Sequence, residues 1–121
     1  MSGQPTSTST PSQLTWTTSA AVSQASVSRG TNQAITAYVT ASRNANALVD
    51  IEIYGPTGTK VWQAYYDNQA FVGGTRRSFQ RNWSVPSNAS VGTYTIKVGV
   101  FSHGWGSVYS WNNNAATFTV H

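Results

Sequence analysis

The sequence predicts an all-β domain with an immunoglobulin- or fibronectin-III-like antiparallel β-sandwich fold of about seven strands. Three observations predict it. Short segments alternate between apolar and polar residues, which is the period of a half-buried strand. No segment shows the apolar spacing of a helix. Turn residues separate the segments at the spacing that sandwiches use, and the 121 residues are enough for one core.

The strands follow one another from about residue 15 to residue 120. A first strand is expected somewhere within 15–28. Clean alternation predicts four further strands, at 34–40, 48–54, 93–100 and 116–120. Less regular alternation predicts two more, at 60–66 and 77–85. Gly, Pro and Asn mark the turns between them, at 29–30, 55–58, 73–74 and 86–92.

The alternation also sorts side chains between the core and the outside. Trp83 has the same parity as Phe79 and is expected in the core, as is Trp62, which lies across the 55–58 hairpin from Ile51. Tyr94, at the start of the sixth strand, fits the position of a tyrosine corner.

Among the charged residues within the predicted strands, one is in an unusual place. Arg81 lies between Phe79 and Trp83 on an apolar face, so it must extend to solvent, find a partner or mark a bulge. Asp50 and Glu52 share the outer face of their strand, which points away from the core, and we expect them to be solvated there.

Composition narrows the class of protein. Only 8% of residues are charged, cysteine is absent, and Ser, Thr, Asn and Gln are abundant, which is typical of secreted, extracellular β-domains. Seven scattered Lys and Arg residues do not form the dense basic stripe of a nucleic-acid binder. No apolar run approaches 18 residues, so no membrane partner is expected. We expect a monomer.

The domain organisation is expected to be a tethered module. Residues 1–13 are almost entirely Ser, Thr, Pro, Gly and Gln, which is the composition of an extended linker. Residues 14–121 are predicted to form the sandwich.

Catalysis and cofactors are not expected. A glycosidase needs two carboxyl groups facing each other across a cleft, and Asp50 and Glu52 lie on one strand. Asp67 is a candidate polar contact, and His103 has no second histidine nearby to complete a metal site. No Gly-rich phosphate loop or nucleophile motif is present in the sequence.

Antiparallel strand order gathers aromatic residues at one end of the predicted sandwich. Gly104 and Gly106 flank Trp105, which leaves its ring approachable, and three Asn residues follow Trp111. The rings either cap the open end of the core or bind a ligand. The candidate ligand-binding residues are Trp105, Trp111, Trp16, Tyr109, Asn112, Asn113 and Tyr66.

Flat rings among neutral hydrogen-bonding groups suit a pyranose sugar, whose C–H face stacks on an aromatic ring while its hydroxyl groups bond to amides. The segments "VDIEIYGPTGTKVWQAYYDNQAF" and "GWGSVYSWNNNAATF", with the Ser/Thr/Pro-rich linker, resemble small β-sandwich carbohydrate-binding modules appended to bacterial cellulases and other plant-cell-wall-degrading enzymes. The resemblance covers residues 14–120. It implies a non-catalytic module that binds β-1,4-glucan such as cellulose and targets a tethered catalytic domain, with Trp105 and Trp111 as platform residues.

Two other functions remain open from the sequence. The first is a structural immunoglobulin-like spacer or protein-interaction module, in which the same rings would cap the core or dock a partner. The second is a basic binder of acidic polysaccharide, which would use Arg76, Arg77 and Arg81.

Overall fold

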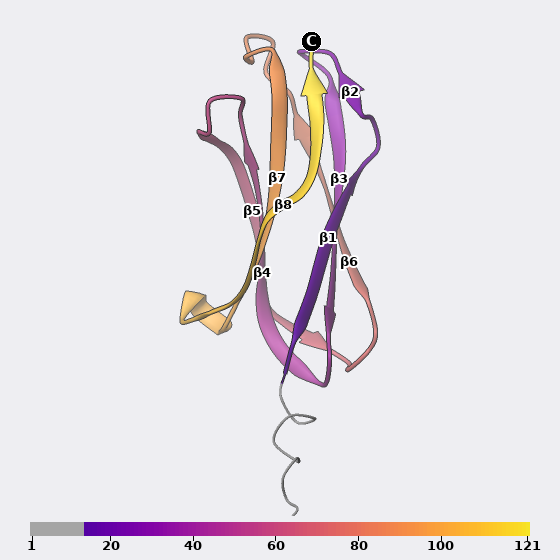
Figure 1. Ribbon diagram of the computed structural model, residues 1–121, viewed down its shortest axis with the longest axis vertical. Coiled ribbons are helices and arrows are strands. Elements are labelled where there is room, and N and C mark those ends of the chain that lie inside the picture. The colour runs from indigo at the N-terminus through magenta and orange to yellow at the C-terminus, as the bar shows by residue number, and fades with distance from the viewer. Residues whose placement is uncertain (1–13) are drawn as a thin grey trace, which may run out of the picture.

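Two β-sheets face each other in the computed structural model, which describes residues 14–121 (Figure 1). The predicted all-β, immunoglobulin-like sandwich is confirmed. The linker predicted at 1–13 lies outside the described residues. Within the described part of the chain, no helix is long and apolar enough to cross a membrane.

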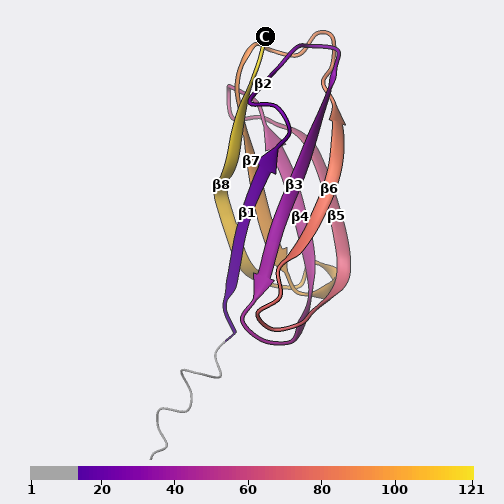
Figure 2. The same cartoon turned by 90° about the vertical axis from the view of Figure 1, so that its right-hand side faces the viewer.

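The sheets are unequal in size, and Figure 2 shows the smaller one nearer the viewer. The three-stranded sheet has the order β1–β3–β6, with bounds β1 (Trp16–Val22), β3 (Asn32–Ala41) and β6 (Arg77–Ser84). The five-stranded sheet has the order β2–β8–β7–β4–β5, with bounds β2 (Ser26–Val27), β4 (Ala45–Tyr54), β5 (Lys60–Phe71), β7 (Gly92–Phe101) and β8 (Val108–Val120). A short 3₁₀ turn, η2 (His103–Trp105), connects β7 to β8.

The predicted first strand is divided between the two sheets. β1 pairs antiparallel with β3, whereas β2 pairs parallel with β8 in the other sheet. Gln33, which is fully buried, supports the crossing between them. Its Oε1 accepts hydrogen bonds from Ser23 Oγ and Gln24 N, and its Nε2 donates to Gln24 O. The side chain therefore satisfies backbone groups that neither sheet can pair.

The last strand is much longer than the predicted 116–120, because the Asn-rich segment belongs to β8 and not to a loop. Val98 pairs with Asn112 while Ile96 pairs with Ala116, so the residues between them form a bulge opposite Lys97. Asn114 N donates to Asn112 Oδ1, which satisfies one backbone group of this bulge.

The core positions follow the predicted parity. Trp83 is buried and packs against Tyr94 and Phe118, with ring centroids 5.5 and 6.1 Å away. The Tyr94 hydroxyl donates to Ser90 O at 2.7 Å, which confirms the tyrosine corner. Trp62 packs half-buried against this core.

Arg81 follows the first of its three alternatives. It is exposed on β6, which is an edge strand, and its guanidinium lies 5.7 Å from the ring centre of Tyr66. The side chain therefore leaves the apolar face over an aromatic ring and keeps its charge in water.

Replacing Trp83 tests the core assignment. Trp83→Ala should lower the free energy of unfolding by roughly 3–5 kcal/mol, because the cavity between Tyr94 and Phe118 cannot close completely. Urea denaturation followed by circular dichroism measures this loss. A variant as stable as the parent chain would contradict the placement of Trp83 in the core.

Candidate functional site

Four aromatic rings form one cluster on the outer face of the five-stranded sheet. Trp105 packs against Tyr65 and Phe101, with ring centroids 5.2 and 5.0 Å away, and Phe101 lies 6.4 Å from Trp111. Tyr65 is 54% exposed, and Trp105 and Trp111 are each 41% exposed. We call Tyr65, Phe101, Trp105 and Trp111 the ring cluster. It is large, apolar and open to solvent on one side.

Strand register explains why these rings meet. Trp111 of β8 pairs with Gly99 of β7, Gly99 with Asp50 of β4, and Asp50 with Tyr65 of β5. The four residues form one row across the sheet, on the face away from the core. Gly99 is required here, because a Cβ atom at this position would lie 2.7 Å from ring atoms of both Phe101 and Trp111.

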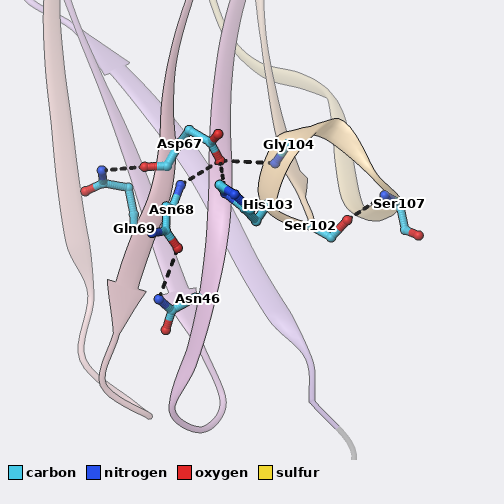
Figure 3. A network of polar contacts seen from close by, with 8 residues as sticks. All are labelled: Asn46, Asp67, Asn68, Gln69, Ser102, His103, Gly104 and Ser107. Carbon is cyan, nitrogen blue, oxygen red and sulfur yellow. Dashed lines mark hydrogen bonds and ion pairs between the residues drawn. The ribbon is translucent and has the colours of Figure 1, made fainter.

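The turn η2 folds back over the same face and contacts β4 and β5. Figure 3 shows how Asp67 of β5 holds it: Asp67 Oδ1 accepts from Gly104 N at 3.3 Å and lies 3.0 Å from His103 Nδ1. Ser107 N donates to Ser102 Oγ at 2.7 Å and closes the turn.

The Asp67 carboxylate suits this role. Burial alone would raise its pKa, but hydrogen bonds from Gly104 N–H, His103 and Asn68 N–H outweigh burial and hold the pKa below its usual value. Asp67 therefore remains an acceptor at neutral pH. His103 serves η2 as a hydrogen-bonding partner of Asp67, and among the described residues no group of three His, Asp or Glu side chains could hold a metal ion.

Trp105 has an unusual backbone. Its φ angle is +67°, in the left-handed region that bulky side chains rarely adopt. Such a conformation costs on the order of 1–3 kcal/mol and persists only where surrounding contacts enforce it. Here the Asp67 contacts with η2 and the packing on Tyr65 and Phe101 supply those contacts.

The seven residues predicted for the site divide into those inside this region and those outside it. Trp105 and Trp111 belong to the ring cluster, and Asn113 is exposed beside it, where its Oδ1 accepts from Trp111 Nε1 at 3.3 Å. The sequence placed the rings at the tip of the sandwich. The structure corrects this, because the cluster lies on the sheet face near that end.

Four predicted residues lie elsewhere. Trp16 and Tyr109 stack on each other, 5.9 Å apart and nearly parallel, where β1 passes β8. Asn112 turns inward and donates to Thr18 O, so it joins the two sheets instead of facing a ligand. Tyr66 is half-buried against Phe79, and its hydroxyl donates to Gln80 O of β6.

Sequence reasoning missed part of this region. Tyr65 and Phe101 were not among the residues predicted for the site, and Gly99 carried no prediction. The alternation of Gln63, Tyr65 and Asp67 along β5 was the available clue, since it places all three on the outer face.

Asp50 and Glu52 contradict the expectation that they are solvated. They do lie on the outer face of β4, yet Asp50 is 0% and Glu52 6% exposed. The physical reason is that η2, the ring cluster and neighbouring side chains of β5 and β7 cover this face. Leu48, opposite Phe101 on the same face, is also fully buried.

Comparison with known proteins supports the fold only. No protein-family model matches the chain, and no curated protein matches it. Solved structures do match. The C-terminal domain of Wzt has a TM-score of 0.65 at 13% identity, covering 86% of this chain and 70% of that one.

Two further solved structures match this chain, one a separate domain and the other part of a larger enzyme. The CARDB domain of a Pyrococcus furiosus protein, solved in complex with di-metal ions, has a TM-score of 0.57 at 19% identity, covering 88% of this chain and 86% of that one. A β-glucosidase from Erythrobacter marinus has a TM-score of 0.58 at 8% identity, where 89% of this chain matches only 16% of the enzyme. The class defined by these comparisons is a small immunoglobulin-like β-sandwich domain.

Adding a methyl group at Gly99 tests the architecture of the ring cluster. Gly99→Ala should displace the rings of Phe101 and Trp111 and destabilise the chain by roughly 1–3 kcal/mol through overpacking. Tryptophan emission should shift to longer wavelength as the indole rings become more solvated. Thr95→Ala, on the same face of β7, is the control. Unchanged emission and stability in Gly99→Ala would contradict the close packing.

Proposed function

We propose that this chain is a non-catalytic carbohydrate-binding module that binds a neutral polysaccharide through the ring cluster. The observation that carries the proposal is the set of three exposed rings, of which Tyr65 and Trp111 lie on the sheet and Trp105 lies on η2 against Tyr65 and Phe101. Stacking of a sugar C–H face on such a ring contributes roughly 0.5–1.5 kcal/mol, by analogy with aromatic pairs.

The surroundings of the cluster favour a neutral ligand. Asn113 and Asn114 offer exposed amide groups next to Trp111, and β8 carries no charged residue. Arg76 and Arg77 contact rings and backbone away from the cluster: Arg76 lies over Tyr38, and Arg77 donates to Ala70 O. These contacts make a basic site for acidic polysaccharide the weaker proposal.

The ring angles support binding of individual chains. The planes of Tyr65 and Trp105 meet at 64°, so the exposed rings do not form one flat surface. A flat crystal face would touch only part of the cluster, whereas a twisted chain can stack on rings that differ in orientation. The resemblance noted above makes β-1,4-glucan the polysaccharide we propose.

The non-catalytic role follows from the carboxyl groups. Asp50 and Glu52 are buried neighbours on one strand, and Asp67 is occupied with η2. No two of the three can act on a substrate from opposite sides. Together with the linker composition of residues 1–13, this supports a secreted module that targets a tethered enzyme to its substrate.

A second function is favoured by one observation. Phe101 lies opposite the fully buried Leu48, and the rings pack on one another, so they also stabilise the sheet as a structural cap would. A spacer or protein-interaction module needs no more than this.

Substituting the two tryptophans separates these functions. Trp105→Leu and Trp111→Leu keep an apolar cover over the sheet but remove the flat ring. Each should weaken binding by roughly 0.5–1.5 kcal/mol, about two- to twelvefold, and the double variant should abolish it. Co-sedimentation with amorphous cellulose, microcrystalline cellulose, chitin, xylan and an acidic glycan measures binding.

The matched control is Tyr38→Ala, which removes a ring from the outer face of the other sheet. Variants should be compared at a temperature where urea denaturation shows each to be folded. If the parent chain binds none of the neutral glycans, or binds as well without both tryptophans, the spacer interpretation is favoured.

Salt provides an independent test. Binding of a neutral glycan by stacking releases few counterions, so affinity should be nearly unchanged from about 50 to 200 mM salt. The same co-sedimentation assay measures it. A tenfold or larger loss over this range would instead support an electrostatic site at Arg76, Arg77 and Arg81.

A further inference from the structure

Two neighbouring carboxyl groups lie buried on the outer face of β4, one of them in the row of the ring cluster, without enough hydrogen-bond partners. Asp50 and Glu52 point from β4 to the outer face and are 0% and 6% exposed. They are two of only three acidic residues in the chain. The function proposed above does not use them, and burial of charge on this scale is costly unless it is compensated.

The two carboxyl groups have fewer hydrogen-bond donors than acceptor oxygens. Asp50 Oδ1 accepts from Gln63 Nε2 at 2.9 Å, but Asp50 Oδ2 is buried and meets no donor. Glu52 Oε1 accepts from the Tyr54 hydroxyl, and its Oε2 shares Gln63 Nε2 at 3.3 Å. One amide group therefore serves both carboxyls.

Few positive charges face the pair. Lys60 of β5 is the nearest, with its Nζ 4.0 Å from Glu52 Oε2 and its side chain 43% exposed. Lys97 of β7 is opposite Glu52 in the strand register, and its Nζ lies over the Tyr54 ring. The remaining titratable groups on this face are Tyr65 and Asp67 of β5 and His103 of η2, and β8 contributes the uncharged Trp111.

We propose that Asp50 and Glu52 hold one proton between them, and that this proton keeps the ring cluster assembled, so that polysaccharide binding is retained at acidic pH and weakened above neutrality. Two carboxylates side by side in a buried site cannot both be charged without strong repulsion. A proton on Asp50 turns it into a donor toward Glu52 and removes the unpartnered charge.

The direction of the pKa shift agrees with this geometry. Burial, together with the Glu52 hydrogen bond, raises the pKa of Asp50 from 3.8 to about 7. Hydrogen bonds from Asp50 and Tyr54 lower the pKa of Glu52 despite its burial. The folded chain therefore favours neutral Asp50, whose stabilising contribution is complete below pH about 4 and is lost as the pH rises to about 7.

The row of residues that crosses the sheet links the Asp50 carboxyl to the ring cluster. Asp50 lies between Gly99, which has no side chain, and Tyr65, and Trp111 follows on the far side of Gly99. A second negative charge at Asp50 must draw water to the place that the rings keep dry. The rings then loosen, and the surface that we propose for polysaccharide is lost. This step rests on the function proposed above.

Carboxyl ¹³C NMR tests the proton directly, because Asp50, Glu52 and Asp67 are the only acidic side chains to assign. Asp50 should titrate with a midpoint near 7, and in Glu52→Gln that midpoint should fall, since the neighbouring negative charge is gone and the new amide can donate to the Asp50 carboxylate. A midpoint below about 5 for Asp50 in the parent chain would overturn the proposal.

Tryptophan emission between pH 5 and 9 tests the coupling. The parent chain should show a transition that follows the Asp50 titration. Asp50→Asn, whose amide can donate to Glu52 at every pH, should remove that transition. His103→Gln should keep it, which separates Asp50 from the only histidine in η2.

Affinity for the polysaccharide should fall by at most about tenfold per pH unit in the parent chain, as expected for one coupled proton, and should be flat in Asp50→Asn. An Asp50 titration near 7 without an emission change would overturn the coupling. The expected NMR and emission transitions in a chain that binds no glycan at any pH would reject the proposed function but support the shared proton.

Discussion

Burial of both faces of β4 is the constraint on which the rest of this structure depends. In a two-layer sandwich, one face of each strand packs on the core and the other usually faces water. Residues 47–53 are all buried, although only alternate ones belong to the core. The outer face of β4 therefore needs a third layer, and the chain supplies it with η2 and the rings of its neighbours.

This third layer determines where the exposed rings lie. Trp105 and Trp111 have one side against the sheet and about two fifths of their surface in water. Asp67 holds η2 in place, so the left-handed backbone of Trp105 is maintained by contacts from a different strand. A surface that is rigid, apolar and partly exposed suits a ligand, since its side chains lose little conformational freedom on binding.

The strands could be predicted well from alternation, because the core face of each strand is chosen by burial and leaves a period of two in the sequence. β8 was predicted too short, since Asn residues are typical of loops, and here they form a bulge that stays within the strand. The exposure of the Trp105 ring could be predicted from the glycines on either side of it.

The buried carboxyls could not be found in the same way. Alternation gave the outward direction of Asp50 and Glu52 correctly, but the residues that bury them include η2 and Trp111, which lie some 50 to 60 positions later in the chain. No local pattern reports that η2 folds back across β4. The inward turn of Asn112 toward Thr18 was missed for a similar reason, because its partner lies on the other sheet.

The most direct test of the central claim, that the ring cluster binds polysaccharide, is to map the proposed surface with a soluble cello-oligosaccharide by two-dimensional NMR. The chain has five tryptophans, and each gives one indole N–H signal. If the claim holds, the signals of Trp105 and Trp111 move on titration while those of Trp62 and Trp83 stay, and the Trp16 signal reports whether its stack with Tyr109 extends the site. Shifts confined to residues away from the ring cluster, such as those around Gly55 and Pro86 at the opposite end, would contradict it.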